Sequence, residues 1–561
     1  MTKLSQAEEE AISKLLDKTE ELIRLNKFDE AETFLNEIAK HKPHEINLPL
    51  QRGALFAKKG EHDKALEQFL AAYKKLPAHF QCINNIAASY FKLNKYKDAI
   101  SFYQKALAIQ PDADFILAAI GWCLFRQGNL DEAMEYIEKA LEISPTLPHA
   151  HSGLLLAMIY AESVSPEQLT EKAKRFGKIV AEIFPPRTDF ANEKNKNRKL
   201  RIGYVSPDFR DHPVPYFLDP LLRNHDRTQF EIYAYSNTPY QNPVMEHMKT
   251  HVDHWRDIYD LKEKEVSDII VNDCIDILVD VTGHTAHNSL TVFAGRAAPV
   301  QASWLGYPAT TGVQTMDYRI TDVNAEPVGM TEHLSTETLW RLPHIFCAYS
   351  AHENSPAVID HPPCEDNGYI TFGCFNNFVK VRDSVLKVWS EIISQVPNSK
   401  LLLEMEGLDD YKFLKQVQKR LKQQNIPLDR VILMQRKRSN QFLLYNKVDL
   451  ALDPFPCNGG TTSFDTLWMG VPFITLAGDH FAARMGVTIL SNAGLPELIA
   501  SDTDAYIKMA VDLVKDKERL KKIRHNLREK FAKSPAMDQK AFARDMEEAY
   551  RGMWNKYCDS N

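Results

Sequence analysis

Residues 66–77 read LEQFLAAYKKLP, residues 100–111 read ISFYQKALAIQP, and residues 134–145 read MEYIEKALEISP. Their final prolines and Pro43 stand 34 residues apart over three intervals. Small residues follow the same spacing, namely Ala31, Ala65, Ala99 and Ala133, and again Ala72, Ala106 and Ala140, where the first unit has Ile38. Alanine lets two helices approach closely, and proline ends a helix because it lacks the backbone N–H group. The repeat therefore predicts stacked antiparallel helical hairpins.

Glycines support this interpretation. Gly53 and Gly121 supply a second small site on the first helix of each unit, and Gly60 and Gly128 fall in the turn between helices. The 34-residue pattern resembles the tetratricopeptide repeat, whose solenoids present a concave groove to peptides or proteins. A spacer or dimerisation arm without a ligand is the alternative. The register is lost after Leu147, so we predict an α-solenoid with capping helices over residues 1–185.

A different pattern follows a polar, basic linker at residues 186–200. Short apolar runs rich in β-formers alternate with helix-like stretches in two series, one starting at LRIGYVSP (200–207) and one at YITFGCF (369–375). This alternation predicts parallel sheets covered by helices. We expect two Rossmann-like domains, 201–360 and 361–540, with a C-terminal helix and tail at 541–561. Ligands of such sheets bind beyond the carboxyl ends of the strands.

Composition excludes several function classes. The 561 residues carry 68 Lys and Arg against 75 Asp and Glu, a net charge of -7, which argues against a general nucleic-acid or anionic-membrane binder. No apolar stretch is long enough for a membrane span, and the start lacks the apolar core of a signal peptide. Eight scattered cysteines without a C-x-x-C pair favour reduced thiols, and we expect a cytoplasmic protein.

The stretch DPFPCNGGTTSFDTLWMGVPFITLAG (453–478) predicts a strand, a glycine turn and a helix. The candidate residues for binding a nucleotide diphosphate in this stretch are Asn458, Gly459, Gly460, Thr461, Thr462 and Asp465. Glycines before hydroxyl residues expose backbone N–H groups at a helix start, where the helix dipole favours a phosphate or diphosphate. The alternative is a threonine N-cap without a ligand.

Two further candidates follow strands. Lys380 comes after the strand YITFGCF and could neutralise charge on a departing diphosphate, or be a solvated lysine. His212, in DFRDHP (208–213), follows the first strand of the other domain and could take a proton from an acceptor, or be a surface residue. Together these positions favour group transfer from an activated nucleotide, without a bound metal because no ligand cluster is evident. A serine hydrolase is excluded because no G-x-S-x-G motif is present.

With these residues in place, the chain resembles the O-GlcNAc transferase family, which includes the SPINDLY proteins. The resemblance rests on DFRDHP, PVQASWLGYPATTG, FGCFNNFVKV, LDPFPCNGGTTSFDTLWMGVPFITLAG and MEEAYRGMW. It implies a two-domain, GT-B-type enzyme that transfers a sugar, foremost GlcNAc from UDP-GlcNAc, to Ser or Thr of proteins bound by the repeats. Inverting, metal-independent transfer without a cofactor beyond the donor is implied. The repeats also offer a surface for a homo-oligomer.

The resemblance also implies roles for individual residues. Lys380 matches the lysine that stabilises the leaving diphosphate, and Asp465 matches the ribose-binding aspartate. His212 matches a proposed base, with proton transfer through the donor phosphate as the alternative. The positions that match the nucleotide-binding residues are Asn377, Arg436, Arg438 and Gln441. The positions that match the sugar pocket are Thr285, Leu305, Gly306, Tyr307 and Pro308.

Three features depart from the family pattern. Gly460 replaces a histidine of the animal enzymes, whereas SPINDLY proteins have a glycine- and threonine-rich loop there. Gln441 replaces a common histidine, and the peptide-gripping asparagine ladder is reduced to Gln51, Asn85 and Ala119. GDP-fucose or UDP-glucose therefore stays an alternative donor, and a glycan or lipid an alternative acceptor. A repeat-based adaptor with a catalytically weak transferase domain is the non-enzyme alternative.

Overall fold

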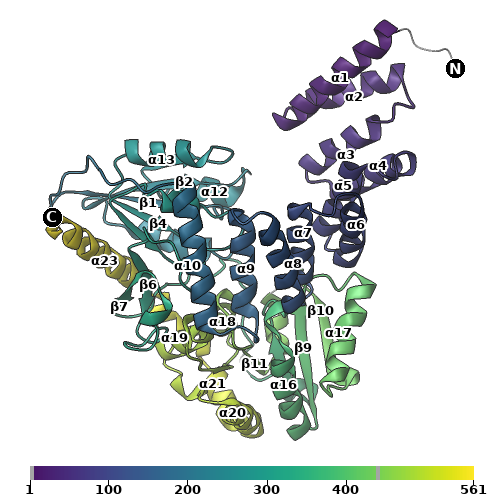
Figure 1. The fold of residues 1–561 in the computed structure, drawn as a ribbon. Coiled ribbons are helices and arrows are strands. Elements are labelled where there is room, and N and C mark those ends of the chain that lie inside the picture. The colour runs from purple at the N-terminus through teal and green to yellow at the C-terminus, as the bar shows by residue number, and fades with distance from the viewer. Residues whose placement is uncertain (1–5, 240, 360, 438–441, 561) are drawn as a thin grey trace. The chain divides into compact units, whose positions relative to one another are not determined.

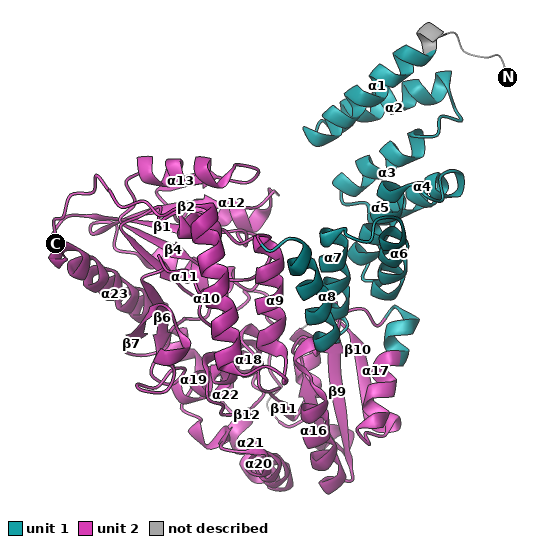
Figure 2. Ribbon diagram, viewed as in Figure 1, with its two compact units in different colours: residues 1–145, 409–415 teal, residues 146–408, 416–561 magenta. Residues whose placement is uncertain are grey.

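The computed structural model describes residues 6–239, 241–359, 361–437 and 442–560. The chain forms two compact units, one of Met1–Pro145 with Asp409–Lys415 and one of Thr146–Leu408 with Gln416–Asn561 (Figure 2). Among the described helices, none combines the length and the apolar character that a bilayer crossing requires. The domain limits expected at 185, 200, 360 and 540 stay predictions.

The first unit consists of helical hairpins, as the repeat predicts (Figure 1). Its helices are α1 (Gln6–Arg24), α2 (Phe28–His41), α3 (Leu48–Lys58), α4 (His62–Lys75), α5 (Phe80–Lys92), α6 (Tyr96–Ile109), α7 (Asp114–Arg126) and α8 (Leu130–Ile143). The repeat alanines are buried between them. A side chain at Gly121 would place its Cβ 2.5 Å from Ile137, so the small residue is required for helix contact.

The turns inside the hairpins also follow the 34-residue spacing. Asn26, Gly60, Asn94 and Gly128 have φ of 57°, 80°, 59° and 79°. Only glycine and, less often, asparagine adopt this left-handed conformation readily at a helix end. The alternation of Asn and Gly was not recognised in the sequence, because the two residue types look unrelated until their shared backbone conformation is seen.

The second unit begins with α9 (Pro148–Tyr160) and α10 (Pro166–Ile183), which pack on the first sheet domain. Gly177 of α10 lies so close to the backbone of Gly312 that an added Cβ would sit 1.8 Å from its carbonyl oxygen. The ring of Phe176 contacts His284 at 4.7 Å between centroids. These helices are thus built into the α/β unit.

The first sheet has seven parallel strands in the order β3-β2-β1-β4-β5-β6-β7. The strands are β1 (Leu200–Ser206), β2 (Phe230–Ser236), β3 (His254–Asp257), β4 (Ile277–Asp280), β5 (Val300–Ser303), β6 (Tyr318–Asp322) and β7 (Thr338–Leu342). The connecting helices are α11 (Pro215–Asn224), α12 (Pro243–Lys249), α13 (Glu263–Asn272) and α14 (Leu290–Ala294).

The second sheet has six parallel strands in the equivalent order β10-β9-β8-β11-β12-β13. The strands are β8 (Ile370–Cys374), β9 (Ser399–Met405), β10 (Val431–Gln435), β11 (Leu450–Leu452), β12 (Phe473–Leu476) and β13 (Ile499–Ala500). The main helices are α16 (Asp383–Gln395), α17 (Tyr411–Gln423), α18 (Thr461–Trp468), α19 (Met485–Asn492), α20 (Thr503–Lys515), α21 (Lys517–Arg524) and α22 (Leu527–Ala532). Both orders are those of a doubly wound Rossmann fold, as predicted.

The last helix, α23 (Gln539–Asp559), returns to the first sheet and packs against α11, β5 and β7. The hydroxyl of Tyr550 lies 3.0 Å from that of Tyr204 on β1. Glu547 accepts a hydrogen bond from the backbone N–H of Asp226 at 2.7 Å. The end of the chain therefore ties the second sheet domain to the first.

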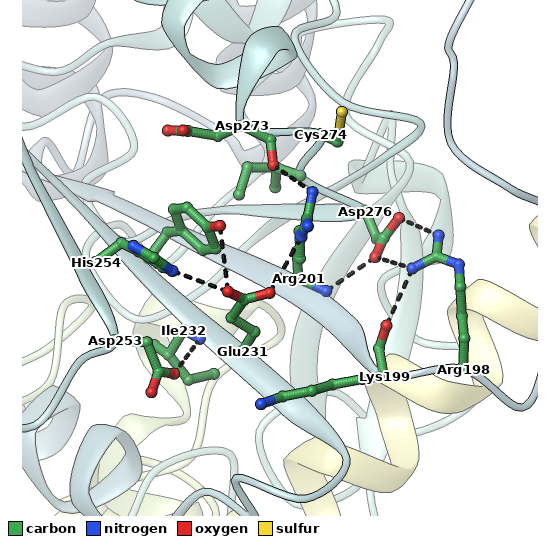
Figure 3. Close-up of polar contacts among 12 residues, drawn as sticks. Arg198, Lys199, Arg201, Glu231, Ile232, Asp253, His254, Asp273, Cys274 and Asp276 are labelled. Carbon is green, nitrogen blue, oxygen red and sulfur yellow. Dashed lines mark hydrogen bonds and ion pairs between the residues drawn. The ribbon is translucent and has the colours of Figure 1, made fainter.

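Ion pairs hold the starting ends of β1 and β2 (Figure 3). Glu231 of β2 lies between Arg201 of β1 and His254 of β3, at 3.1 Å and 2.8 Å. Asp276 pairs with Arg198 and accepts the backbone N–H of Arg201 at 2.8 Å. These charged groups therefore satisfy one another at the amino ends of the strands.

Candidate functional site

A buried aspartate organises the glycine loop of the second sheet. Asp453 directly follows β11, and its carboxylate accepts the N–H of Gly459 and the hydroxyl of Thr475, both at 2.7 Å. Burial raises the pKa of Asp453 to about 7, against the lowering effect of these bonds and of Lys380. The loop is therefore closed onto the strand that precedes it.

The two glycines of the loop play different parts. A Cβ on Gly459 would lie 2.2 Å from Ser463 Oγ and 2.9 Å from Asp453, so no side chain fits. A Cβ on Gly460 would meet only Met485, at 3.8 Å. Helix α18 begins at the next residue, and no acceptor is found among the described residues for the N–H groups of Thr461 and Thr462. These groups point to an anion site at a helix start.

Alanine should therefore be harmful at Gly459 and tolerated at Gly460. Gly459→Ala is expected to destabilise the loop and to lower nucleotide affinity by at least about 10-fold, because the neighbours must move apart. Gly460→Ala is expected to leave the melting temperature nearly unchanged. Differential scanning fluorimetry and nucleotide titration of both variants check this, and equal effects would contradict the assignment.

Lys380 lies at the end of the short 3-10 helix Phe378–Lys380, after β8. Its Nζ donates to the carbonyl oxygen of Asn458 at 2.5 Å and lies 5.9 Å from the ring centroid of Tyr160 on α9. Burial disfavours the charged form, but the neighbouring Cys457 and Asp453 outweigh it, so the pKa of Lys380 is raised. A protonated ammonium group is thus held against the glycine loop.

Asp465 is buried one turn inside α18, and the hydroxyl of Tyr349 donates to its Oδ1 atom. Burial raises the pKa of Asp465 to about 7, although Tyr349 and the charge of Arg436 act to lower it. Arg436 follows β10, donates to the carbonyl oxygen of Phe375 and lies 3.3 Å from Glu404. The second sheet therefore brings Lys380, Arg436 and Asp465 to the edge that the carboxyl ends of its strands form.

The remaining residues expected to bind the nucleotide differ in their exposure to solvent. Asn377 is exposed, and its Oδ1 caps the short helix by accepting the N–H of Val379 at 3.2 Å. Asn458 is buried, and its side chain donates to Pro454 at 3.0 Å. Arg438 and Gln441 lie outside the described residues.

His212 lies in the loop between β1 and α11, and its side chain is 33% exposed. Its Nδ1 accepts the backbone N–H of Val214 at 3.4 Å and lies 3.5 Å from Asp208 Oδ1. Burial lowers the pKa of His212, while Asp208 acts to raise it, so the neutral imidazole is favoured at neutral pH. Within the described residues, no hydrogen bond or ion pair joins His212 to Lys380.

The predicted sugar-pocket residues follow β4 and β5 of the first sheet. Thr285 donates to Thr282 at 3.0 Å, and Leu305 has φ of 75° in a tight turn. Gly306 has no room for a side chain, because its Cβ would lie 2.3 Å from Val281 O. Tyr307 is buried and donates to Leu155 at 3.2 Å, so its hydroxyl holds the loop. Pro308 is half-buried beside it.

Sequence reasoning missed the groups that hold these loops. Asp453 was inside a quoted motif, but its role depends on the fold. Asp280 accepts the N–H of Gly283 at 2.8 Å at the end of β4, and burial raises its pKa to about 7. Tyr349 comes from a loop far from Asp465 in the chain. A carboxylate directly after a strand and before a glycine turn is the signal that could have identified both aspartates.

Two parallel Rossmann-like sheets with such loops define a GT-B-type glycosyltransferase architecture. The chain belongs to glycosyl transferase family 41, whose profile matches residues 156–355 and 364–546. A tetratricopeptide repeat profile matches residues 79–146. The family and the fold class predicted from the sequence are thereby confirmed.

Relatives agree with this placement. The chain is 38% identical over 430 residues to the rice protein "Probable UDP-N-acetylglucosamine--peptide N-acetylglucosaminyltransferase SPINDLY" and 38% identical over 423 residues to its Arabidopsis thaliana counterpart. These alignments cover 76% and 74% of this chain but 46% of each relative, so the chain spans about half of their length. The structure of a mutant Thermobaculum terrenum O-GlcNAc transferase superposes with a TM-score of 0.86 and 31% identity, covering 92% of this chain and 98% of that one.

Proposed function

We propose that this protein is a protein O-glycosyltransferase that moves a sugar from a nucleoside diphosphate sugar to Ser or Thr hydroxyls of proteins. The observation that carries the proposal is the ammonium group of Lys380 fixed beside the free N–H groups at the start of α18. UDP-GlcNAc is the donor proposed first, because the names of the SPINDLY relatives specify UDP-N-acetylglucosamine and a peptide.

The donor half of the site acts on the leaving group. The N–H groups of Thr461 and Thr462 would bind the diphosphate, and Lys380 would offset the charge that develops on it as the bond to the anomeric carbon breaks. Side-chain and backbone groups supply this stabilisation, so we propose that transfer is metal-independent.

The acceptor half would lie on the first sheet. The hydroxyl attacks the anomeric carbon from the face opposite the diphosphate, and the product has inverted configuration. For His212 to take the hydroxyl proton at Nε2, the ring hydrogen must move to Nδ1, which in this structure accepts the N–H of Val214 at 3.4 Å. Asp208 Oδ1, 3.5 Å from Nδ1, is the acceptor that this tautomer would use. Proton transfer through the donor phosphate is the alternative, and a His212→Gln variant that retains transfer would favour it.

Asp465 would accept the ribose hydroxyls, which makes donor binding pH-dependent. A carboxylate accepts two such bonds, whereas a protonated carboxyl accepts fewer. Because burial raises the pKa of Asp465 to about 7, the group is protonated below this pH and must lose its proton to bind ribose well.

Nucleotide affinity should therefore rise by up to about 10-fold as pH increases from about 6 to about 8. Calorimetric titration of the nucleotide across this range measures the effect. Asp465→Asn is expected to bind weakly with little change over the same range. An unchanged pH profile in that variant would show that another group is responsible.

The donor sugar and base remain open between UDP-GlcNAc, UDP-glucose and GDP-fucose. The free space above Gly460 favours no single one, since it leaves room that a histidine side chain fills in the animal enzymes. Titration with UDP and GDP distinguishes the bases. Tighter binding of GDP than of UDP would overturn the proposed donor.

Protein acceptors would bind the groove of the repeats, since the first unit has the tetratricopeptide pattern. Association of two copies through the repeats and a cytoplasmic location stay proposals. An adaptor with an inactive transferase domain would show no nucleotide binding, and the intact Lys380 and glycine loop argue against it.

A further inference from the structure

Three potential metal ligands meet at α11 and α12 of the first sheet domain. Asp219 is buried on α11, His247 lies on α12, and His251 lies two residues beyond the end of that helix. One ligand atom from each of the three residues lies within 4.8 Å of the others. The sequence showed no ligand cluster, because 27 residues lie between the aspartate and the first histidine and only the fold brings them together.

The distances suit a small ion. Asp219 Oδ1 lies 2.7 Å from His251 Nδ1 and 3.6 Å from His247 Nε2. Bonds of 2.0–2.2 Å in a tetrahedral zinc site place neighbouring ligand atoms about 3.3–3.6 Å apart. Small side-chain rotations would therefore bring all three atoms to bonding distance.

The ligands are held in place by contacts of their own. One carboxylate oxygen, Asp219 Oδ2, faces Arg223 at 3.7 Å. The other, Oδ1, is hydrogen-bonded to His251 Nδ1 at 2.7 Å, and a bound ion would replace that hydrogen bond. The carbonyl oxygen of His251 accepts a hydrogen bond from Arg227, and its backbone N–H donates to Met248 at 3.0 Å. The side chains of Met245 and Met248 anchor α12 in the core. Such outer contacts orient the ligands of metal sites.

We propose that Asp219, His247 and His251 form a zinc-type metal site. Two imidazoles and one carboxylate form a set of ligands that favours a borderline ion such as Zn²⁺ over Mg²⁺ or Ca²⁺. The fourth position would hold water, because the side chain of His247 is 58% exposed. The site is separate from the proposed transfer chemistry and does not depend on it.

The site would clamp α12 to α11. The side chain of Asn242, just before α12, donates to the carbonyl oxygen of Phe209 at 3.2 Å, in the loop that carries His212. A metal bound between α11 and α12 would also stabilise the loop that carries Phe209 and His212. Its expected effect is therefore on stability.

The test uses the full chain without a histidine tag, stripped of metal by a chelator and titrated with Zn²⁺ in a calorimeter. We expect one equivalent to bind and to raise the melting temperature. His247→Ala should fold normally because its side chain is exposed, and should weaken binding by more than the roughly 10- to 100-fold that loss of an outer-shell partner costs. His254→Gln, three residues beyond His251 and paired with Glu231, is the control and should bind normally.

Co²⁺ identifies the ligands. Histidine and carboxylate ligation gives weak visible bands, whereas binding at the half-buried Cys274 or Cys558 would add strong near-ultraviolet absorption. Three results would each overturn the proposal. They are an absence of saturable zinc binding, equal zinc binding by His247→Ala and the unmodified protein, and a spectrum of thiolate-bound cobalt. The first outcome would mean that Asp219 and His251 form only an ion pair.

Discussion

Replacing Lys380 by alanine is expected to lower sugar transfer by at least about 10³-fold while the protein stays folded. The ammonium group is the cation that the structure fixes against the glycine loop, through its 2.5 Å bond to the carbonyl oxygen of Asn458. Without it, charge on the departing diphosphate is offset by backbone N–H groups alone. Steady-state rates with the donor, together with a circular dichroism spectrum, measure the effect.

Lys387→Ala is the matched control, because Lys387 is exposed on the following helix α16. It should transfer at the normal rate. Normal turnover by Lys380→Ala would contradict the assignment of the site. A loss of activity with an altered melting curve would call for Lys380→Met, which preserves the buried volume of the side chain.

Replacing Asp453 by alanine is expected to lower transfer by about 100-fold without removing any group that touches the donor. The N–H of Gly459 and the hydroxyl of Thr475 lose their acceptor, and each unsatisfied buried group costs about 1–3 kcal/mol. The loop before α18 should then lose its fixed conformation. Nucleotide affinity by calorimetry and transfer rate should fall together.

Asp453→Asn distinguishes positioning from charge. Its amide oxygen can still accept the N–H of Gly459, so affinity should be partly restored. Burial raises the pKa of Asp453 to about 7, so the folded protein keeps a proton that the unfolded chain releases above about pH 4. This group therefore makes stability fall as pH rises from about 4 to about 7.

Asparagine removes this contribution, and the loss of melting temperature between about pH 5 and about pH 8 should be smaller in Asp453→Asn than in the unmodified protein. An identical pH profile would show that Asp453 does not titrate in this range. Full activity of Asp453→Ala would show that the loop holds its shape without the carboxylate.

Much of the fold could be predicted from the sequence. The repeat was evident because prolines and alanines recur in register, and the buried strands appeared as apolar runs. β3, which reads HWRD, and β13, with two residues, were missed because they are short and carry no such run. β7, which reads TLWRL, was also missed, and it is an edge strand that is only partly buried. Near the end of the chain, residues 503–559 form α20, α21, α22 and α23, since local caps such as Asp516 and Asp538 begin new helices.

The sequence could predict the part of the candidate site whose residues lie together in one motif. Gly459, Thr461 and Asp465 are close in the chain, and the helix start that presents them follows from local residue types. Asp453, Tyr349 and the metal-ligand cluster depend on long-range contacts, which periodicity does not encode. Family resemblance supplied the positions on the first sheet, and their roles stay predictions.

The central claim is sugar transfer from a nucleotide donor to protein hydroxyl groups. The most direct measurement incubates the protein with a cell lysate and, in separate reactions, UDP-GlcNAc, UDP-glucose and GDP-fucose, and maps modified peptides by mass spectrometry. We predict N-acetylhexosamine on Ser or Thr residues with UDP-GlcNAc, absent with Lys380→Ala. Lack of any sugar on Ser or Thr with all three donors would contradict the account.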